Sequence, residues 1–219
     1  ACVSEMATAI KGGERMSKLF VLAHRAVVTL GVLCQLSVSC AHASQADGAP
    51  HVLFVKVGTG IEDKKFEAAV PKACEQMRVK WRSERIAKIT VKEIIVSVES
   101  QLARWGKNAV LVVYVADDPQ LPGLLNLPGQ CSLINLRTMR SDKPSEAVYD
   151  SRLQRLLMKG LAYAAGTGGN HDPRCVMYWK SFSVGEIDKT SSTFGPYAYF
   201  ALQDILRSLG GSAIFSEGQ

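Results

Sequence analysis

The sequence is poor in aromatic residues, and its charged residues do not cluster. It also contains no internal repeat. These absences exclude several classes of protein. Aromatic side chains make up 7% of the 219 residues, and no run mixes them with arginine as RNA-binding segments do. The formal charge of +6 is spread along the chain, so we expect no nucleic-acid partner. Eight prolines and 47% hydrophobic residues exclude a disordered chain and are typical of a globular domain with a sizeable core.

The chain also lacks an apolar run long enough to cross a bilayer comfortably. Its longest run, Ala26–Val38, follows the basic residues Lys18 and Arg25 and precedes two small residues, Ala41 and Ala43. A basic stretch, an apolar stretch and an A-x-A site in this order are typical of a secretory signal peptide. We therefore expect cleavage after Ala43 and an exported protein, either periplasmic or secreted.

Residues 1–43 are accordingly interpreted as a leader plus signal peptide, and residues 44–219 as one domain without an integral membrane segment. Translation is expected to start at Met16, because the codons for Lys11–Arg15 can form the purine-rich stretch of a bacterial ribosome-binding site. Lipid attachment at Cys40 is the less favoured alternative, since a serine stands three positions earlier, where an aliphatic residue is usual.

The predicted exported domain carries little net charge and few cysteines. Residues 1–43 contain four basic and two acidic residues, so the remainder holds 22 basic and 18 acidic residues and a formal charge of +4. The remaining cysteines are Cys74, Cys131 and Cys175. In an oxidising compartment they could form one disulfide and leave one thiol, or all three could be buried thiols, and spacing does not choose between these alternatives.

Hydrophobic periodicity divides the predicted domain into alternating strands and helices. Apolar runs predict strands over residues 51–57, 109–117 and 131–139, with a less regular strand over 79–89. Helical spacing predicts helices over 61–77, 90–106, 141–166 and 197–209. The order indicates an α/β domain with a twisted, mostly parallel sheet.

Local signals mark several boundaries of these elements. Thr90 and Glu93 form a capping box at a helix start, and Gly106 is placed to end that helix. Pro71 is expected to interrupt or kink the first helix. Residues 118–129 have the proline and glycine density of a loop.

The segment KGLAYAAGTGGNHDPRCVMY has the outline of a metal-binding helix and turn without the metal ligands. A metzincin-type zinc site needs H-E-x-x-H-x-x-G-x-x-H: the three histidines reach one ion, and the glutamate polarises a zinc-bound water. With Gly166 on the motif glycine, the histidine positions hold Lys159, Tyr163 and Gly169, and the glutamate position holds Gly160.

A regularly spaced set of residues follows this helix. Asn170, four further residues, Cys175 and Met177 are followed by GEIDK and then by Gly195 and Ala198. In the archaemetzincins the same spacing reads cysteine, four residues, C-x-M, an acidic-Asp-Lys segment and a final cysteine pair. On these residues the chain resembles an archaemetzincin, over residues 50–200 or so.

This resemblance implies a particular fold. We expect a metzincin-like three-layer α/β domain, whose twisted, mostly parallel sheet has one antiparallel edge strand. An active-site-type helix would be followed by a Met-turn formed by Cys175, Met177 and Tyr178.

The resemblance also locates a cleft, in which the family holds a catalytic zinc ion. All ligands of that ion are replaced here, as are three of the four cysteines that bind the family's structural zinc, so we expect no metal, no cofactor and no catalytic residue. Candidate cleft contacts are Lys159, Tyr163, Gly166 and His171. The interpretation is an inactive peptidase homologue that binds a peptide or protein partner along a sheet edge near residues 124–136, by strand addition.

Other functions remain open at this stage. Lys159 and Tyr163 share a helix face and could perform acid–base chemistry in a hydrolase, although a snorkelling lysine beside a packed tyrosine gives the same pattern. His51, His171 and Cys175 could form a different metal site, and Cys131 or Cys175 with His171 a thiol protease, although NHDP is typical of a turn. An unrelated α/β envelope protein with a structural or binding role is a further alternative.

Overall fold

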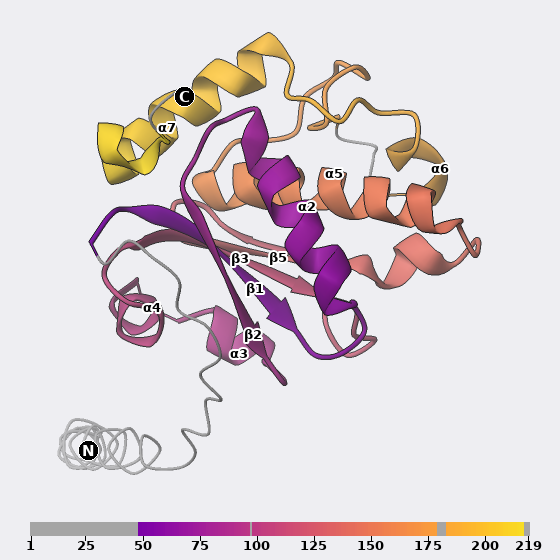
Figure 1. Ribbon diagram of the computed structural model, residues 1–219, viewed down its shortest axis with the longest axis horizontal. Coiled ribbons are helices and arrows are strands. Elements are labelled where there is room, and N and C mark those ends of the chain that lie inside the picture. Colours follow the sequence, from indigo (N-terminus) through magenta and orange to yellow (C-terminus); the bar gives the residue numbers. More distant parts are fainter. Residues whose placement is uncertain (1–47, 97, 179–182, 217–219) are drawn as a thin grey trace, which may run out of the picture. The chain divides into compact units, whose positions relative to one another are not determined.

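A five-stranded sheet organises the computed structural model, which describes residues 48–96, 98–178 and 183–216 (Figure 1). The predicted leader and signal peptide, residues 1–43, lie outside the described residues. The strands are β1 (His51–Val57), β2 (Trp81–Ile86), β3 (Ala109–Ala116), β4 (Leu124–Leu127) and β5 (Cys131–Asn135).

The sheet has the order β2-β1-β3-β5-β4, and its pairs are parallel except the antiparallel pair of β4 with β5. All of β1 and β5 and nearly all of β3 are buried, because helices cover both faces of the sheet. The mostly parallel sheet with one antiparallel edge strand confirms the fold predicted from the sequence.

Helices form a layer on each face of the sheet (Figure 1). One layer contains α2 (Asp63–Glu75), α5 (Glu146–Ala165) and α7 (Pro196–Gly210), and the other contains α3 (Val91–Ile94) and α4 (Val98–Trp105). Strand residues alternate between the two layers, so that Val113 packs with α5 while Val112 and Tyr114 pack with α3 and α4. The shorter helical elements are η1 (Leu136–Arg140), α6 (Val184–Ile187) and η2 (Ser212–Ile214).

The prediction of one continuous helix from Thr90 to Gly106 is wrong, because the helix is broken in its middle into α3 and α4. Its start is right, since Thr90 and Glu93 make both capping-box hydrogen bonds, and so is its end, where Gly106 has φ +88°. Between α3 and α4 the chain leaves helical geometry at Ile95, and the buried Gln101 side chain donates to the Ile94 carbonyl at 3.0 Å. The β-branched run after Glu93 weakens the helix there, and the glutamine replaces a helical hydrogen bond.

Two other local predictions need correction. Helix α2 runs through Pro71 without interruption, because Pro71 and Glu67 lie on its exposed side, where water can bind the carbonyl that the proline leaves without a donor. The segment 118–129 contains β4 and is not loop throughout, since four of its residues pair with β5. The cysteines Cys74, Cys131 and Cys175 are free and buried.

No helix in residues 48–96, 98–178 and 183–216 combines the length and the apolar character that a membrane crossing requires.

Candidate functional site

The end of α5 has the geometry that the motif glycine predicts. Helix α5 stops at Ala165, and Gly166 adopts a left-handed conformation with φ +92°, which glycine accepts without strain. The Gly166 and Thr167 amides donate to carbonyls of the last helical turn, at 2.9 and 2.8 Å. The chain then turns toward the segment that contains His171 and Cys175.

Lys159, at the first histidine position, is completely buried. Its ammonium donates to the carbonyl of Tyr178 at 3.1 Å and so joins α5 to the turn that follows it. Burial lowers the pKa of Lys159 to about 8, and the nearby Cys175 only partly opposes this effect. The side chain is therefore an enclosed contact between two segments and does not snorkel to the surface.

Gly160, at the position of the catalytic glutamate, lies against the sheet without space for a side chain. A Cβ atom at this position would lie 2.6 Å from Val113 Cγ1 and 3.0 Å from Ile134 Cγ1. Ser132 also donates its hydroxyl to the Gly160 carbonyl at 2.8 Å. Side chains of β3 and β5 thus fill the volume that the first atoms of a general base would need.

The other two ligand positions bring no imidazole to the site. Tyr163 is half-buried, and burial raises the pKa of its phenol, so it is a poor zinc ligand near neutral pH. Gly169 is exposed and offers no side chain. Among the described residues, no group of three His, Cys, Asp or Glu side chains is placed to hold a metal ion. This donor set does not fit the zinc ion that the motif would hold.

The residues Cys175–Tyr178 form a tight, mostly buried turn. The Tyr178 amide donates to the Cys175 carbonyl at 3.0 Å, and Met177 is fully buried beneath the turn. The Cys175 sulfur accepts the amides of Met177 at 3.3 Å and of Gly195 at 3.1 Å. Gly195 stands at a cysteine position of the archaemetzincin pattern. It is therefore a direct neighbour of Cys175, the one cysteine of that pattern that this chain retains.

His171 lies in an exposed loop. The Asp172 amide donates to the Asn170 side chain at 3.1 Å, and the Arg174 amide donates to the Asp172 carboxylate at 2.9 Å. These side chain–backbone bonds form the turn that the sequence NHDP predicts. His51 sits at the start of β1, where its ring bonds to the Ala49 carbonyl at 3.0 Å.

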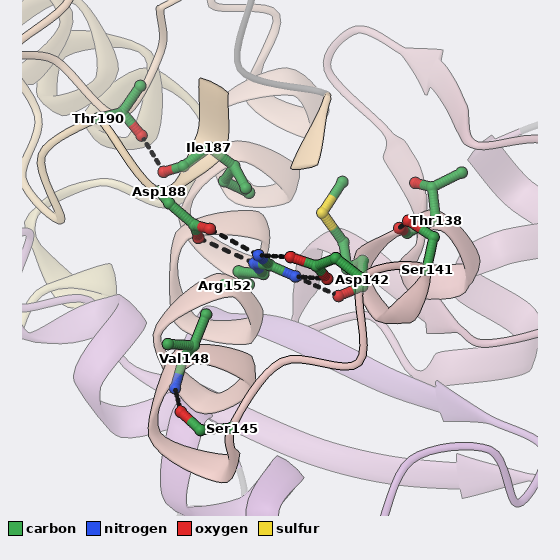
Figure 2. Close-up of polar contacts among 10 residues, drawn as sticks. Thr138, Ser141, Asp142, Ser145, Val148, Arg152, Ile187, Asp188 and Thr190 are labelled. Carbon is green, nitrogen blue, oxygen red and sulfur yellow. Dashed lines mark hydrogen bonds and ion pairs between the residues drawn. The ribbon is translucent and has the colours of Figure 1, made fainter. Parts of the chain in front are cut away.

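The sequence did not predict a cluster of ion pairs and hydrogen bonds around Arg152 (Figure 2). The guanidinium, 1% exposed, makes two hydrogen bonds to Asp142 at 2.8 and 2.7 Å and also contacts both oxygens of Asp188. A fifth bond reaches the Met139 carbonyl at 2.6 Å. The arginine thus ties α5 to η1 and α6, and it holds the pKa of both carboxyls below the usual range. An arginine within the apolar stripe of α5, one turn after Tyr149 and directly before Leu153, was the available signal.

The edge strand β4 lies beside the end of α5. The Gly129 amide, after β4, donates to the Ala164 carbonyl at 2.7 Å, and a Cβ atom added at Gly166 would lie 3.3 Å from the Pro128 Cβ. Among the described strands, β4 pairs only with β5, and all four of its residues are partly exposed. The chain that follows β4 is therefore attached to the end of the helix that carries Lys159 and Tyr163.

Two solved structures share this fold. The archaemetzincin of Methanopyrus kandleri has a TM-score of 0.56 at 19% sequence identity, covering 73% of this chain and 96% of its own. The zinc-dependent peptidase of Methanocorpusculum labreanum has a TM-score of 0.52 at 10% identity, covering 68% and 99%. No protein-family model matches the sequence, and no curated protein does. The chain has an archaemetzincin-like fold, as the spacing around Cys175 and Met177 predicted.

Proposed function

We propose that this chain is an exported, catalytically inactive relative of the zinc peptidases, which binds an extended peptide or protein segment beside α5. The proposal joins the archaemetzincin-like fold to a site whose residues do not fit the metal. Export is supported by the signal-peptide pattern that ends at Ala43.

The observation that carries the proposal is the packing of Gly160. Losing a single ligand could leave a weakened site, but here the base position is closed by Val113 and Ile134. Restoring a glutamate would require α5 to move away from the sheet, against the Ser132–Gly160 hydrogen bond. Peptide hydrolysis through a zinc-bound water therefore has neither its ligands nor the space for its base.

Peptide binding is supported by the edge strand. A strand at the edge of a sheet presents backbone N–H and C=O groups that another chain can pair with. Strand β4 offers four residues for such pairing, and three of them are leucines that can contact apolar side chains of a ligand. In this proposal the bound segment lies beside the end of α5, where Tyr163 is half-buried.

Metal analysis and a peptidase assay test the loss of zinc chemistry. We expect the purified protein to carry less than stoichiometric zinc and to leave casein intact. The quadruple variant K159H/G160E/Y163H/G169H restores the motif and serves as the comparison, and we expect it to remain inactive because position 160 is closed. Stoichiometric zinc in the wild type, or casein hydrolysis that a chelator stops, would contradict the proposal.

A second candidate, a hydrolase that uses Lys159 without a metal, is favoured by one observation. A lysine with pKa about 8 is partly neutral near neutral pH and can accept a proton, and Tyr163 lies one turn away on the same face. Hydrolysis of chromogenic esters that rises through pH 8 and disappears in Lys159→Met would support this candidate. No difference between wild type and variant would remove it.

A further inference from the structure

Strand β2 forms one edge of the sheet, at the opposite end from β4 (Figure 1). Among the described strands, β2 pairs only with β1. All six of its residues are at least partly exposed, in contrast to the fully buried β1 beside it. The side chain of Trp81 is 38% exposed and leaves apolar surface at this edge. An edge of this kind offers backbone groups and apolar contacts to another chain.

Two hydrogen bonds show which backbone groups of β2 point away from the sheet. Two amides, one in β1 and one just after it, donate to the carbonyls of Lys80 and Ile86, each at 2.9 Å. In a parallel pair a strand bonds to its neighbour through alternate residues, so β1 engages the even-numbered residues of β2. The N–H and C=O groups of the odd-numbered residues therefore point outward, at Trp81, Ser83 and Arg85.

The direction of these groups restricts how a second copy of β2 can pair with the first. In an antiparallel pair, outward-pointing residues lie opposite outward-pointing residues, so a two-fold axis between identical strands passes through one residue position. Among the four inner positions of β2, an axis at Arg82, Glu84 or Arg85 would place two like charges directly opposite one another. An axis at Ser83 brings together two small, uncharged side chains.

The register centred on Ser83 makes the strand complementary to itself. Arg82 of each copy lies opposite Glu84 of the other, at positions without backbone hydrogen bonds, where side chains come closest. Trp81 lies opposite Arg85, whose guanidinium can stack on the indole. Arg85 is already oriented by ion pairs to two carboxylates of α2. Opposite charges and aromatic contacts across an antiparallel pair both stabilise it.

We propose that two copies of this chain associate through antiparallel pairing of their β2 strands, about a two-fold axis at Ser83, and so form one continuous sheet. Charged side chains at an edge strand usually prevent such pairing, because like charges meet. The sequence WRSER instead places opposite charges face to face when it pairs with itself. The dimer leaves the β4 edge free, so this inference does not depend on the proposed peptide binding.

Sedimentation equilibrium of the purified protein, at concentrations up to about 1 mM, tests the association. We expect a monomer–dimer equilibrium, and we expect Glu84→Arg to raise its dissociation constant about tenfold because both Arg82–Glu84 pairs become repulsive. The control Asp204→Arg makes the same charge reversal on the exposed side of α7 and is expected to leave the dissociation constant unchanged. Urea denaturation checks that each variant is folded.

Charge exchange between copies tests the register. R82E alone is expected to associate as poorly as E84R, whereas an equal mixture of R82E and E84R, or the double variant R82E/E84R, restores opposite charges at both pairs and is expected to dimerise like the wild type. A mixture that does not associate overturns the proposed register and with it the dimer.

Three results with the other samples also overturn the proposal. They are a wild type that is monomeric at every concentration, an E84R variant that dimerises as tightly as the wild type, and association that continues beyond the dimer. A monomeric wild type that binds a fluorescent peptide of the β2 sequence would assign this edge to an extended peptide instead of a second copy.

Discussion

Helix α5 buries two cations, one in each half, and the protein treats them in opposite ways. Arg152, 1% exposed, meets two carboxylates that neutralise its charge, and its pKa is raised above the usual value. Lys159, 0% exposed, donates to a backbone carbonyl that bears no net charge, and its pKa is lowered. Two equally buried cations therefore affect the stability of the fold in opposite directions. The arginine holds three segments together, whereas the charged lysine opposes folding.

This difference is in line with the proposed function. A buried charge that weakens a fold is typical of functional positions, which natural proteins retain despite the loss of stability. Lys159 occupies the first histidine position of the metzincin motif, whereas Arg152 lies two helical turns earlier, in a cluster that positions α6. The first half of α5, with Arg152, therefore has a structural role, and the second half, with Lys159, borders the proposed binding region.

The largest expected effect is on the structural half. Arg152→Met removes five hydrogen bonds and leaves Asp142 and Asp188 without their cation, so we expect the free energy of unfolding to fall by about 3 kcal/mol. Urea denaturation measures this change. Arg174→Met is the matched control, because Arg174 also pairs with an aspartate but is 88% exposed, and we expect a change within about 0.5 kcal/mol. Equal effects of the two variants would remove the distinction.

The second largest expected effect is an increase in the free energy of unfolding. Lys159→Met keeps an unbranched chain and removes the desolvated charge, so we expect the unfolding free energy at pH 7 to rise by about 2 kcal/mol, after the loss of the bond to Tyr178. Thermal and urea denaturation measure it. A fall in stability would mean that the ammonium stabilises the turn more than its burial opposes folding.

A smaller effect is expected where α5 touches the sheet. Gly160→Ala gains helix propensity but places a methyl group 2.6 Å from Val113, so we expect a net destabilisation of about 1 to 2 kcal/mol. The double variant Gly160→Ala with Val113→Ala removes the clashing atom and is expected to lose less than the sum of the single effects. Strict additivity in urea denaturation would show that the two positions do not compete for the same space.

The pH dependence of stability gives the finest distinction between the two halves. The folded pKa of Lys159, about 8, is below its ordinary 10.5, so between these values the unfolded chain binds more protons and stability rises with pH. The folded pKa values of Asp142 and Asp188 are below their ordinary 3.8, so that contribution is present at neutral pH and is lost as pH falls through them. We expect Lys159→Met to lose the alkaline slope and Arg152→Met to lose part of the acid slope, as measured by unfolding across pH 3 to 10.

Local signals predicted the parts of the fold that local chemistry controls. The capping box at Thr90, the helix end at Gly166 and the buried strands each depend on a few neighbouring residues, so their patterns were sufficient. The Arg152 cluster was missed because its partners are 10 and 36 residues away, and only the turns between α5, η1 and α6 bring them together. The break after Ile94 was missed for a similar reason, since the Gln101 side chain that replaces a helical bond comes from the next helix.

The sequence by itself determined the α/β order, the absence of histidines at positions 159, 163 and 169, and the glycine that ends α5, because each is a matter of residue type and spacing. Only the tertiary structure decided that Gly160 is closed by Val113 and Ile134, and that Lys159 is enclosed instead of snorkelling. The distance between a helix and its sheet, and the water that a charge loses on burial, depend on side chains far apart in the chain. Packing therefore decided what a degenerate motif could not: the base position is filled, and the first ligand position holds a buried cation.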